Sequence, residues 1–297
     1  MPLPSAAPEP APESLCVAAA DGHAAQLLLL RGEPGRKLGL LWLPAMGVPA
    51  RKYRHFAAAL AGRGWSVALH EWRGQDSSNW RAARACDWGY AQLLADVAAS
   101  REQLAEAAAD TQWIVAGHSL GGQLAALALA QRPQDFAGYA IVGSGHPWWR
   151  TFPGWHQGVL LAAIAGFRLV SAVCGYFPGD KVGFAGREAR GVIRDWADSA
   201  ASGEYRPAAL DFAAEARLRK VVTPALALRL CSDWYVPAAS LDYLLAKLPL
   251  LQLQRGEIAD REFSGGRAGH FEWMREPLPV VARIDAWLAG IEATTGS

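Results

Sequence analysis

The chain has 297 residues, of which 52% are hydrophobic, enough for one large α/β domain with an insertion or for two ordinary domains. Its 29 basic and 28 acidic residues nearly cancel and form no charged block, so nucleic acid is not expected as a partner. The four cysteines lie far apart without a CxxC pair, which argues against a zinc site and against a disulfide framework.

The first 14 residues are rich in Pro and Ala and lack the basic and apolar regions of a signal peptide. A flexible tail over residues 1–14 is therefore predicted. Without an export signal, a cytoplasmic location is the expectation.

Short apolar runs then alternate with helical patterns. The predicted strands are 39–43, 65–72, 113–116 and 139–142, and the predicted helices between them begin near 53, 90 and 120. The pattern resumes with a strand at 225–230, a helix from about 237, a strand at 250–254 and a last helix ending near 288. This order predicts a mostly parallel sheet covered by helices on both faces.

Residues 146–220 break this rhythm because they are helical in pattern, Trp-rich at the start and charged toward the end. We interpret them as a helical insertion between two strands of a core that comprises residues 15–145 and 221–297. Within the insertion, residues 158–177 are nearly all apolar and about long enough to span a bilayer. Arg168 lies near the middle, so a buried or pocket-covering helix pair is favoured over membrane contact.

The segment Gly117-His118-Ser119-Leu120-Gly121 follows a predicted strand and opens a predicted helix. A Gly-x-Ser-x-Gly turn in this context exposes the serine hydroxyl above the sheet, because small flanking residues let strand and helix approach closely. A serine needs a nearby base before it can attack a carbonyl carbon. Ser119 is the predicted nucleophile, and His118 is taken as a structural neighbour without a chemical role.

The base and the acid follow from chain order, which in this arrangement is nucleophile, acid, histidine. His270 is the histidine that lies after the last plausible acid, in a Gly-rich loop before the final helix. Asp233 directly follows the strand at 225–230 and can orient His270, although it could instead only cap the next helix. Asp260 is the fallback acid; Glu257 and Asp242 are less well placed.

An oxyanion hole needs two backbone N–H donors aimed at the developing negative charge. Leu120, next after the nucleophile, is the first candidate, and the loop that follows residues 39–43 should supply the second. Met46 is the best candidate there, and a packing role for its side chain would not exclude this one.

These segments together resemble the α/β-hydrolase superfamily, within it the bacterial hydrolases related to serine aminopeptidases and monoacylglycerol-lipase-like enzymes. The resemblance covers residues 25–290 and is carried by GHSLGG at 117–122, EWRGQDSS at 71–78, Asp233 and GHF at 269–271. It implies an eight-stranded, mostly parallel sheet with a cap, which residues 146–220 would form. The chain departs from many relatives at Pro44-Ala45, where they carry His-Gly, and at Glu71, where they carry Asp.

The cap of similar enzymes forms the acyl or alcohol pocket, and four aromatic residues at its start are candidates for the lining. These are His146, Trp148, Trp149 and Trp155, which could equally well only seal the cap onto the core. The sequence therefore predicts a carboxylesterase-like serine hydrolase of a small apolar ester or thioester, needing no metal or organic cofactor. An acyltransferase or peptidase with the same triad is the nearest alternative, and a catalytically silent binding protein is the alternative of another class.

Overall fold

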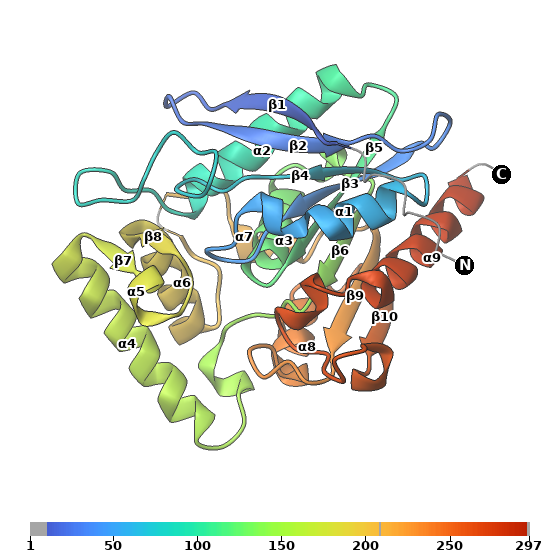
Figure 1. Cartoon of the computed structure of the whole chain (residues 1–297). Helices are drawn as coiled ribbons and strands as arrows, with labels where there is room; N and C mark the ends of the chain where they lie inside the picture. Colours follow the sequence, from blue (N-terminus) through green and yellow to red (C-terminus); the bar gives the residue numbers. More distant parts are fainter. Residues whose placement is uncertain (1–10, 208, 296–297) are drawn as a thin grey trace, which may run out of the picture.

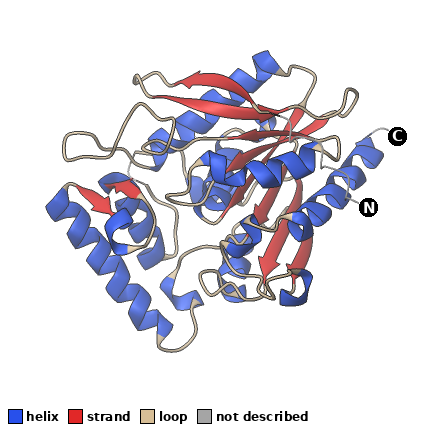
Figure 2. Ribbon diagram, in the orientation of Figure 1, coloured by secondary structure: helices blue, strands red, loops and turns tan. Residues whose placement is uncertain are grey.

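The computed structural model describes residues 11–207 and 209–295. Its main sheet has eight strands in the order β1-β2-β4-β3-β5-β6-β9-β10 (Figures 1 and 2). From β4 onward all neighbours are parallel, whereas β2 is antiparallel to both β1 and β4. The strands are β1 Glu13–Ala18, β2 Ala24–Leu30, β3 Leu38–Leu43, β4 Ser66–Leu69, β5 Gln112–His118, β6 Gly138–Val142, β9 Pro224–Leu230 and β10 Gln252–Ile258. The predicted mostly parallel, eight-stranded sheet is confirmed.

Helices cover both faces of this sheet, because its central strands are apolar on both sides. Alternate residues of β3 separate into two buried clusters: Leu41 and Leu43 lie in one, and Leu40 and Trp42 in the other. The first cluster includes residues of α2 Tyr90–Ala107, α3 Leu120–Gln131 and α8 Ala238–Ala246. The second includes residues of α1 Arg54–Ala61 and α9 Leu278–Thr295, which pack together.

The parallel strands end at one edge of the sheet, and the loops that follow them meet there. β3 leads into the loop at 44–49, β5 into Ser119, β9 into Asp233, and β10 into the loop that carries His270. The fold thus brings together Ser119, Asp233 and His270, which lie far apart in the chain, with the loop at 44–49.

The N-terminal prediction needs correction. Residues 1–10 of the predicted flexible tail lie outside the described residues, but Glu13 and Ser14 already belong to β1. β1 and β2 form an antiparallel pair at the sheet edge that the sequence interpretation did not include. Their side chains alternate in burial, and the inward ones, such as Leu27 and Leu29, join the core.

The insertion forms a separate lobe beside the sheet, at the left of Figure 1. It contains α4 His156–Cys174, α5 Gly179–Val182, α6 Arg190–Ser202 and a small antiparallel pair, β7 Tyr176–Pro178 and β8 Arg187–Ala189. The lobe is therefore not purely helical. Its last helix, α7 Ala214–Leu218, packs against α3 of the core.

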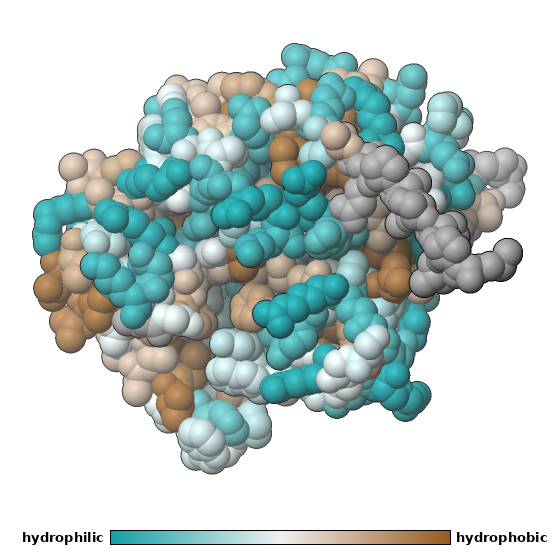
Figure 3. Space-filling model, viewed as in Figure 1, coloured by the Kyte–Doolittle hydropathy of each residue, from teal (hydrophilic) through white to brown (hydrophobic). Residues whose placement is uncertain are grey.

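The sequence predicted a buried or pocket-covering helix pair at 158–177, but the segment is neither a pair of helices nor buried. It is one long helix, α4, followed by β7, and only Ile164 and Ser171 of that helix are buried. Its outward face carries exposed apolar side chains, and Figure 3 shows hydrophobic surface along the edge where Figure 1 places α4. Among the described helices, α4 alone is long and apolar enough to cross a membrane by length and composition.

Candidate active site

Ser119 occupies a sharp turn between β5 and α3. Its φ of 54° and ψ of −121° are unusual for a residue with a side chain, and such backbone strain is typical of functional sites. The turn is fixed through the Ser119 carbonyl, which accepts hydrogen bonds from the Ser144 hydroxyl at 2.7 Å and the Gly122 N–H at 3.1 Å. The predicted strand–turn–helix context of Ser119 is present.

The flanking glycines are required by close backbone contacts. A Cβ atom on Gly121 would lie 2.0 Å from the carbonyl oxygen of Leu43, and one on Gly117 would lie 2.4 Å from the carbonyl carbon of Gly121. Real Cβ atoms do not approach backbone atoms this closely, so any larger residue would displace the turn. The Gly-x-Ser-x-Gly spacing thus follows from packing as well as from backbone strain.

Asp233 and His270 form a buried pair. His270 Nδ1 lies 2.7 Å from Asp233 Oδ2, and both side chains are at most 5% exposed. The other oxygen, Oδ1, accepts the backbone N–H groups of Tyr235 at 2.9 Å and Val236 at 3.1 Å. Asp233 therefore holds its own loop and also binds His270; it does not cap the next helix, α8, whose N-cap residue is Pro237.

The loop after β3 is fixed at three points. The Trp72 indole donates to the Pro44 carbonyl at 2.8 Å, Ala45 N–H donates to the Tyr53 hydroxyl at 3.0 Å, and Val48 N–H donates to the Ala45 carbonyl at 3.1 Å. Within the described residues, neither Met46 N–H nor Leu120 N–H donates a hydrogen bond. Both predicted oxyanion donors are thus available to a ligand.

The sequence and the fold can be compared with known proteins. A model of the family described as serine aminopeptidase, S33, matches residues 40–172, a segment that contains the loop after β3 and the Ser119 turn. The fold recurs in a monoacylglycerol lipase from Paleococcus ferrophilus, with a TM-score of 0.60, 16% identity and coverage of 89% of this chain and 98% of that one. The chain has the α/β-hydrolase fold.

Two further solved α/β hydrolases align over most of this chain. One belongs to the metagenome-derived lipolytic enzymes LipS and LipT, with a TM-score of 0.62, 18% identity and coverage of 90% and 98%. The other is a putative aryl esterase from Burkholderia cenocepacia, with a TM-score of 0.58, 16% identity and coverage of 95% and 100%. No curated protein matches this sequence significantly. At these identities the solved structures establish the fold alone.

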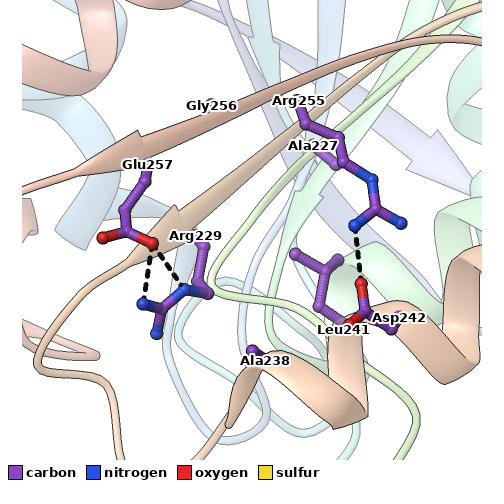
Figure 4. A pocket seen from close by; sticks show the side chains of 8 residues that line it. All are labelled: Ala227, Arg229, Ala238, Leu241, Asp242, Arg255, Gly256 and Glu257. Atoms are coloured by element: carbon purple, nitrogen blue, oxygen red, sulfur yellow. Dashed lines mark hydrogen bonds and ion pairs between the residues drawn. The ribbon is translucent and has the colours of Figure 1, made fainter.

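The other candidate acids have different partners. Glu257 binds Arg229 at 2.7 Å and Asp242 binds Arg255 at 2.6 Å, on opposite sides of a hollow between β9, β10 and α8 (Figure 4). The fallback, Asp260, accepts bonds from Ala268 N–H, Cys231 Sγ and the Ser232 hydroxyl, which hold its pKa below the usual range. It therefore joins the loop that carries Asp233 to the loop that carries His270.

The hydroxyl of Ser119 makes no hydrogen bond to His270 within the described part of the chain. Such contacts are often long or misaligned before substrate binds, and they tighten in the reacting complex. The turn that carries Ser119 and the loop that carries His270 nevertheless meet, because the ring centroids of His118 and His270 lie 4.6 Å apart.

Three of the four aromatic residues predicted to line a pocket lie where the insertion meets the core. His146 is fully buried against Tyr205 and Tyr243, and burial lowers its pKa to about 2, so it is neutral. Trp148 packs on Tyr243, and Trp149 packs against the small apolar cluster of the cap. The prediction that Trp155 lines a pocket is wrong, because this residue is 72% exposed at the start of α4 and stacks on His156.

Sequence reasoning missed several residues that contact the site. Tyr235, two positions after Asp233, packs on His270 with ring centroids 4.9 Å apart, and Phe184 of the cap stacks on Tyr235. Glu188, also from the cap, accepts a hydrogen bond from Gln75 at 3.3 Å, and burial raises its pKa to about 7. Only the position of Tyr235 beside the acid could have indicated such a role.

Proposed function

We propose that this protein is a serine hydrolase that cleaves a carboxylic ester or thioester with an apolar acyl group through an acyl-enzyme. The observation that carries the proposal is the buried Asp233–His270 pair at the same sheet edge as the strained Ser119 turn. The match of residues 40–172 to the serine aminopeptidase family model supports hydrolysis in general. Lipases and esterases among the structural neighbours favour an ester bond as the target.

In the first half of the proposed reaction, His270 Nε2 takes the hydroxyl proton as Ser119 Oγ forms a bond to the carbonyl carbon. The carbonyl oxygen becomes an anion and accepts hydrogen bonds from Met46 N–H and Leu120 N–H. Asp233 holds the Nδ1 proton of His270 and stabilises the imidazolium. The bond to the leaving alcohol or thiol then breaks, and His270 returns the proton to that group.

In the second half, water replaces the leaving group. His270 removes a proton from water as its oxygen attacks the acyl carbon, and the same two N–H groups stabilise the second anion. Collapse of this intermediate releases the acid and returns the proton to Ser119. An acyltransferase would use another acceptor in place of water, and a peptidase would use an amide in place of the ester. Those two alternatives share every residue of this mechanism.

The apolar character of the substrate is proposed from a row of aromatic side chains that leads into the site. Phe167 of α4 packs on Phe184 at 5.1 Å, Phe184 stacks on Tyr235 at 6.4 Å, and Tyr235 contacts His270. Aromatic walls of this kind favour an apolar acyl chain over a charged one. A polar or peptide substrate would find few hydrogen-bonding partners along this row.

A series of p-nitrophenyl esters of increasing acyl length tests the proposal. We expect turnover that rises with chain length before it levels off, and that disappears in Ser119→Ala and in His270→Ala. A catalytically silent binding protein would give no turnover above background. Faster turnover of aminoacyl p-nitroanilides than of any ester would favour the peptidase.

A second candidate, a lipid hydrolase that works at a bilayer surface, is favoured by the exposed face of α4. Leu169 and Val173 on this face are 66% and 64% exposed. The charged residue of the helix, Arg168, is bound to Asp198 of α6 at 2.9 Å. Apolar side chains on one helix face with a Trp at its end are typical of helices that lie in a membrane interface. The inner face of α4 carries Phe167, so a lipid at this surface would lie near the aromatic row.

Flotation with phosphatidylcholine vesicles, with and without phosphatidylglycerol, tests this candidate. We expect wild type to float with the vesicles and the double variant Leu169→Glu, Val173→Glu to remain in the soluble fraction. Val222→Glu is the matched control, because Val222 is 64% exposed on the core, outside the cap. If wild type instead forms a dimer that the double variant abolishes, the face binds a second copy and the lipid proposal is wrong.

A further inference from the structure

Tyr53 lies at the start of α1, fully buried between the loop after β3 and the Ser119 turn. Its hydroxyl has two partners. It accepts a hydrogen bond from Ala45 N–H at 3.0 Å, and it lies 2.8 Å from His118 Nδ1. One hydroxyl group therefore connects the residue before the proposed oxyanion donor Met46 with the residue before the nucleophile Ser119.

The directions of these two bonds follow from their chemistry. The Ala45 N–H can only donate, so the Tyr53 oxygen accepts there and its own hydrogen is free to point at His118 Nδ1. With Nδ1 as the acceptor, the buried Tyr53 hydroxyl has a partner for its hydrogen; the His118 hydrogen is then on Nε2 and the ring is neutral. Complete burial lowers the pKa of His118 well below its usual value, in agreement with a neutral ring.

The other side of the His118 ring faces the proposed base. The His118 and His270 centroids are 4.6 Å apart. His118 Nε2 itself makes no hydrogen bond within the described residues. Trp273, at 5.3 Å, and Phe271, at 5.8 Å, close the remaining edges of the ring. His118 thus forms one wall of the pocket that holds the His270 loop.

We propose that Tyr53 and His118 are positioning residues that hold the oxyanion loop, the nucleophile turn and the His270 loop in one arrangement. The proposal rests on the proposed function, because it assumes that these three segments act together on an ester. It assigns a role to His118 beyond that of a packed neighbour of Ser119. Neither side chain touches the substrate, so both act through the residues that do.

The arrangement of these three segments depends on the hydroxyl oxygen of Tyr53. Without the Tyr53 hydroxyl, Ala45 N–H and His118 Nδ1 would both be buried without a partner, and the loop would shift to find one. Met46 N–H belongs to the peptide bond that joins Ala45 to Met46, so a shift of Ala45 also changes the direction of Met46 N–H. Misplacement of a reacting group by about 1 Å can cost about 100-fold in rate.

The test compares Tyr53→Phe with Tyr139→Phe. Tyr139 is also fully buried and loses a similar bond, from its hydroxyl to the Gly122 carbonyl at 2.8 Å. For Tyr53→Phe we expect kcat to fall by about 10- to 100-fold at nearly unchanged KM, with an equal drop in the rate of fluorophosphonate labelling. For Tyr139→Phe we expect a comparable loss in Tm with kcat close to wild type. Equal kcat in the two variants would overturn the proposal.

A second pair of variants covers the case in which Tyr53→Phe does not fold. His118→Asn keeps an acceptor for the Tyr53 hydroxyl, whereas His118→Leu removes it while keeping the volume. We expect Asn to retain about tenfold more kcat than Leu, and equal values would contradict the positioning role. Wild type serves as the separate check on the proposed function: if it neither labels nor turns over esters, that function is wrong.

Discussion

Replacing Asp233 with Asn should change the tautomer of His270 while leaving the fold in place. Asp233 Oδ1 accepts two backbone N–H groups, from Tyr235 and Val236, and only an oxygen can keep those bonds. The new amide group must therefore turn its NH2 toward His270 Nδ1, at the 2.7 Å position of Oδ2. A donor there forces His270 Nδ1 to accept, which moves the ring hydrogen to Nε2. In that tautomer His270 cannot take the proton of Ser119.

The expected loss in kcat is about 10⁴-fold, the loss typical of a triad whose histidine is held in the wrong tautomer. This corresponds to an increase of about 5 to 6 kcal/mol in the activation free energy. The assay is ester turnover at saturating substrate, with the unfolding midpoint measured beside it. The midpoint should move little, because Asn has the same shape as Asp and keeps two of its bonds. Asp260→Asn is the matched control and should lose much less activity. An Asp233→Asn variant that kept a tenth of wild-type kcat would refute the claim that Asp233 fixes the tautomer of His270.

Two further predictions concern stability. Burial raises the pKa of Glu188 from 4.5 to about 7, so the folded state binds this proton more tightly than the unfolded state does. The free energy of unfolding therefore falls as the pH rises from 4.5 to about 7, by about 3 kcal/mol at most. Glu188→Gln should therefore show a smaller fall in unfolding free energy between pH 5 and pH 8 than wild type, and an unchanged pH dependence in urea melts would contradict this assignment. Gly121→Ala should not yield folded protein, because its Cβ would lie 2.0 Å from a carbonyl oxygen. Gly158→Ala, on the exposed side of α4, should instead raise the free energy of unfolding by about 0.5 to 1 kcal/mol. Soluble yield and thermal melting measure both effects, and a folded, active Gly121→Ala would be inconsistent with the described turn.

The sequence predicted the parts of this fold that depend on local pattern. The apolar strands on both sides of Ser119 were correctly expected, because a strand buried on both faces must be apolar throughout. The helix predicted to begin near residue 120 is α3, which begins at Leu120. The Gly spacing around Ser119 was also interpretable, since the close contacts of Gly121 allow no other residue.

Long-range contacts could not be predicted in the same way. Nothing in the local sequence of Tyr53 distinguishes a core tyrosine from one whose hydroxyl joins Ala45 to His118. Strands β1 and β2 were missed because the sequence of β2, Ala24–Leu30, is almost entirely apolar and does not show the alternation in burial that the structure has. The exposure of α4 was missed because an apolar helix is normally buried, and composition does not reveal which surface covers it.

Mass spectrometry of the protein after reaction with a fluorophosphonate tests the central claim most directly, because the reagent bonds to a serine only when a base and an oxyanion hole activate it. We predict one adduct per chain, on the peptide that contains Ser119, and none on Ser119→Ala under the same conditions. The adduct should form far more slowly on His270→Ala. An unlabelled wild type, or an adduct that persists in Ser119→Ala, would contradict the proposed mechanism.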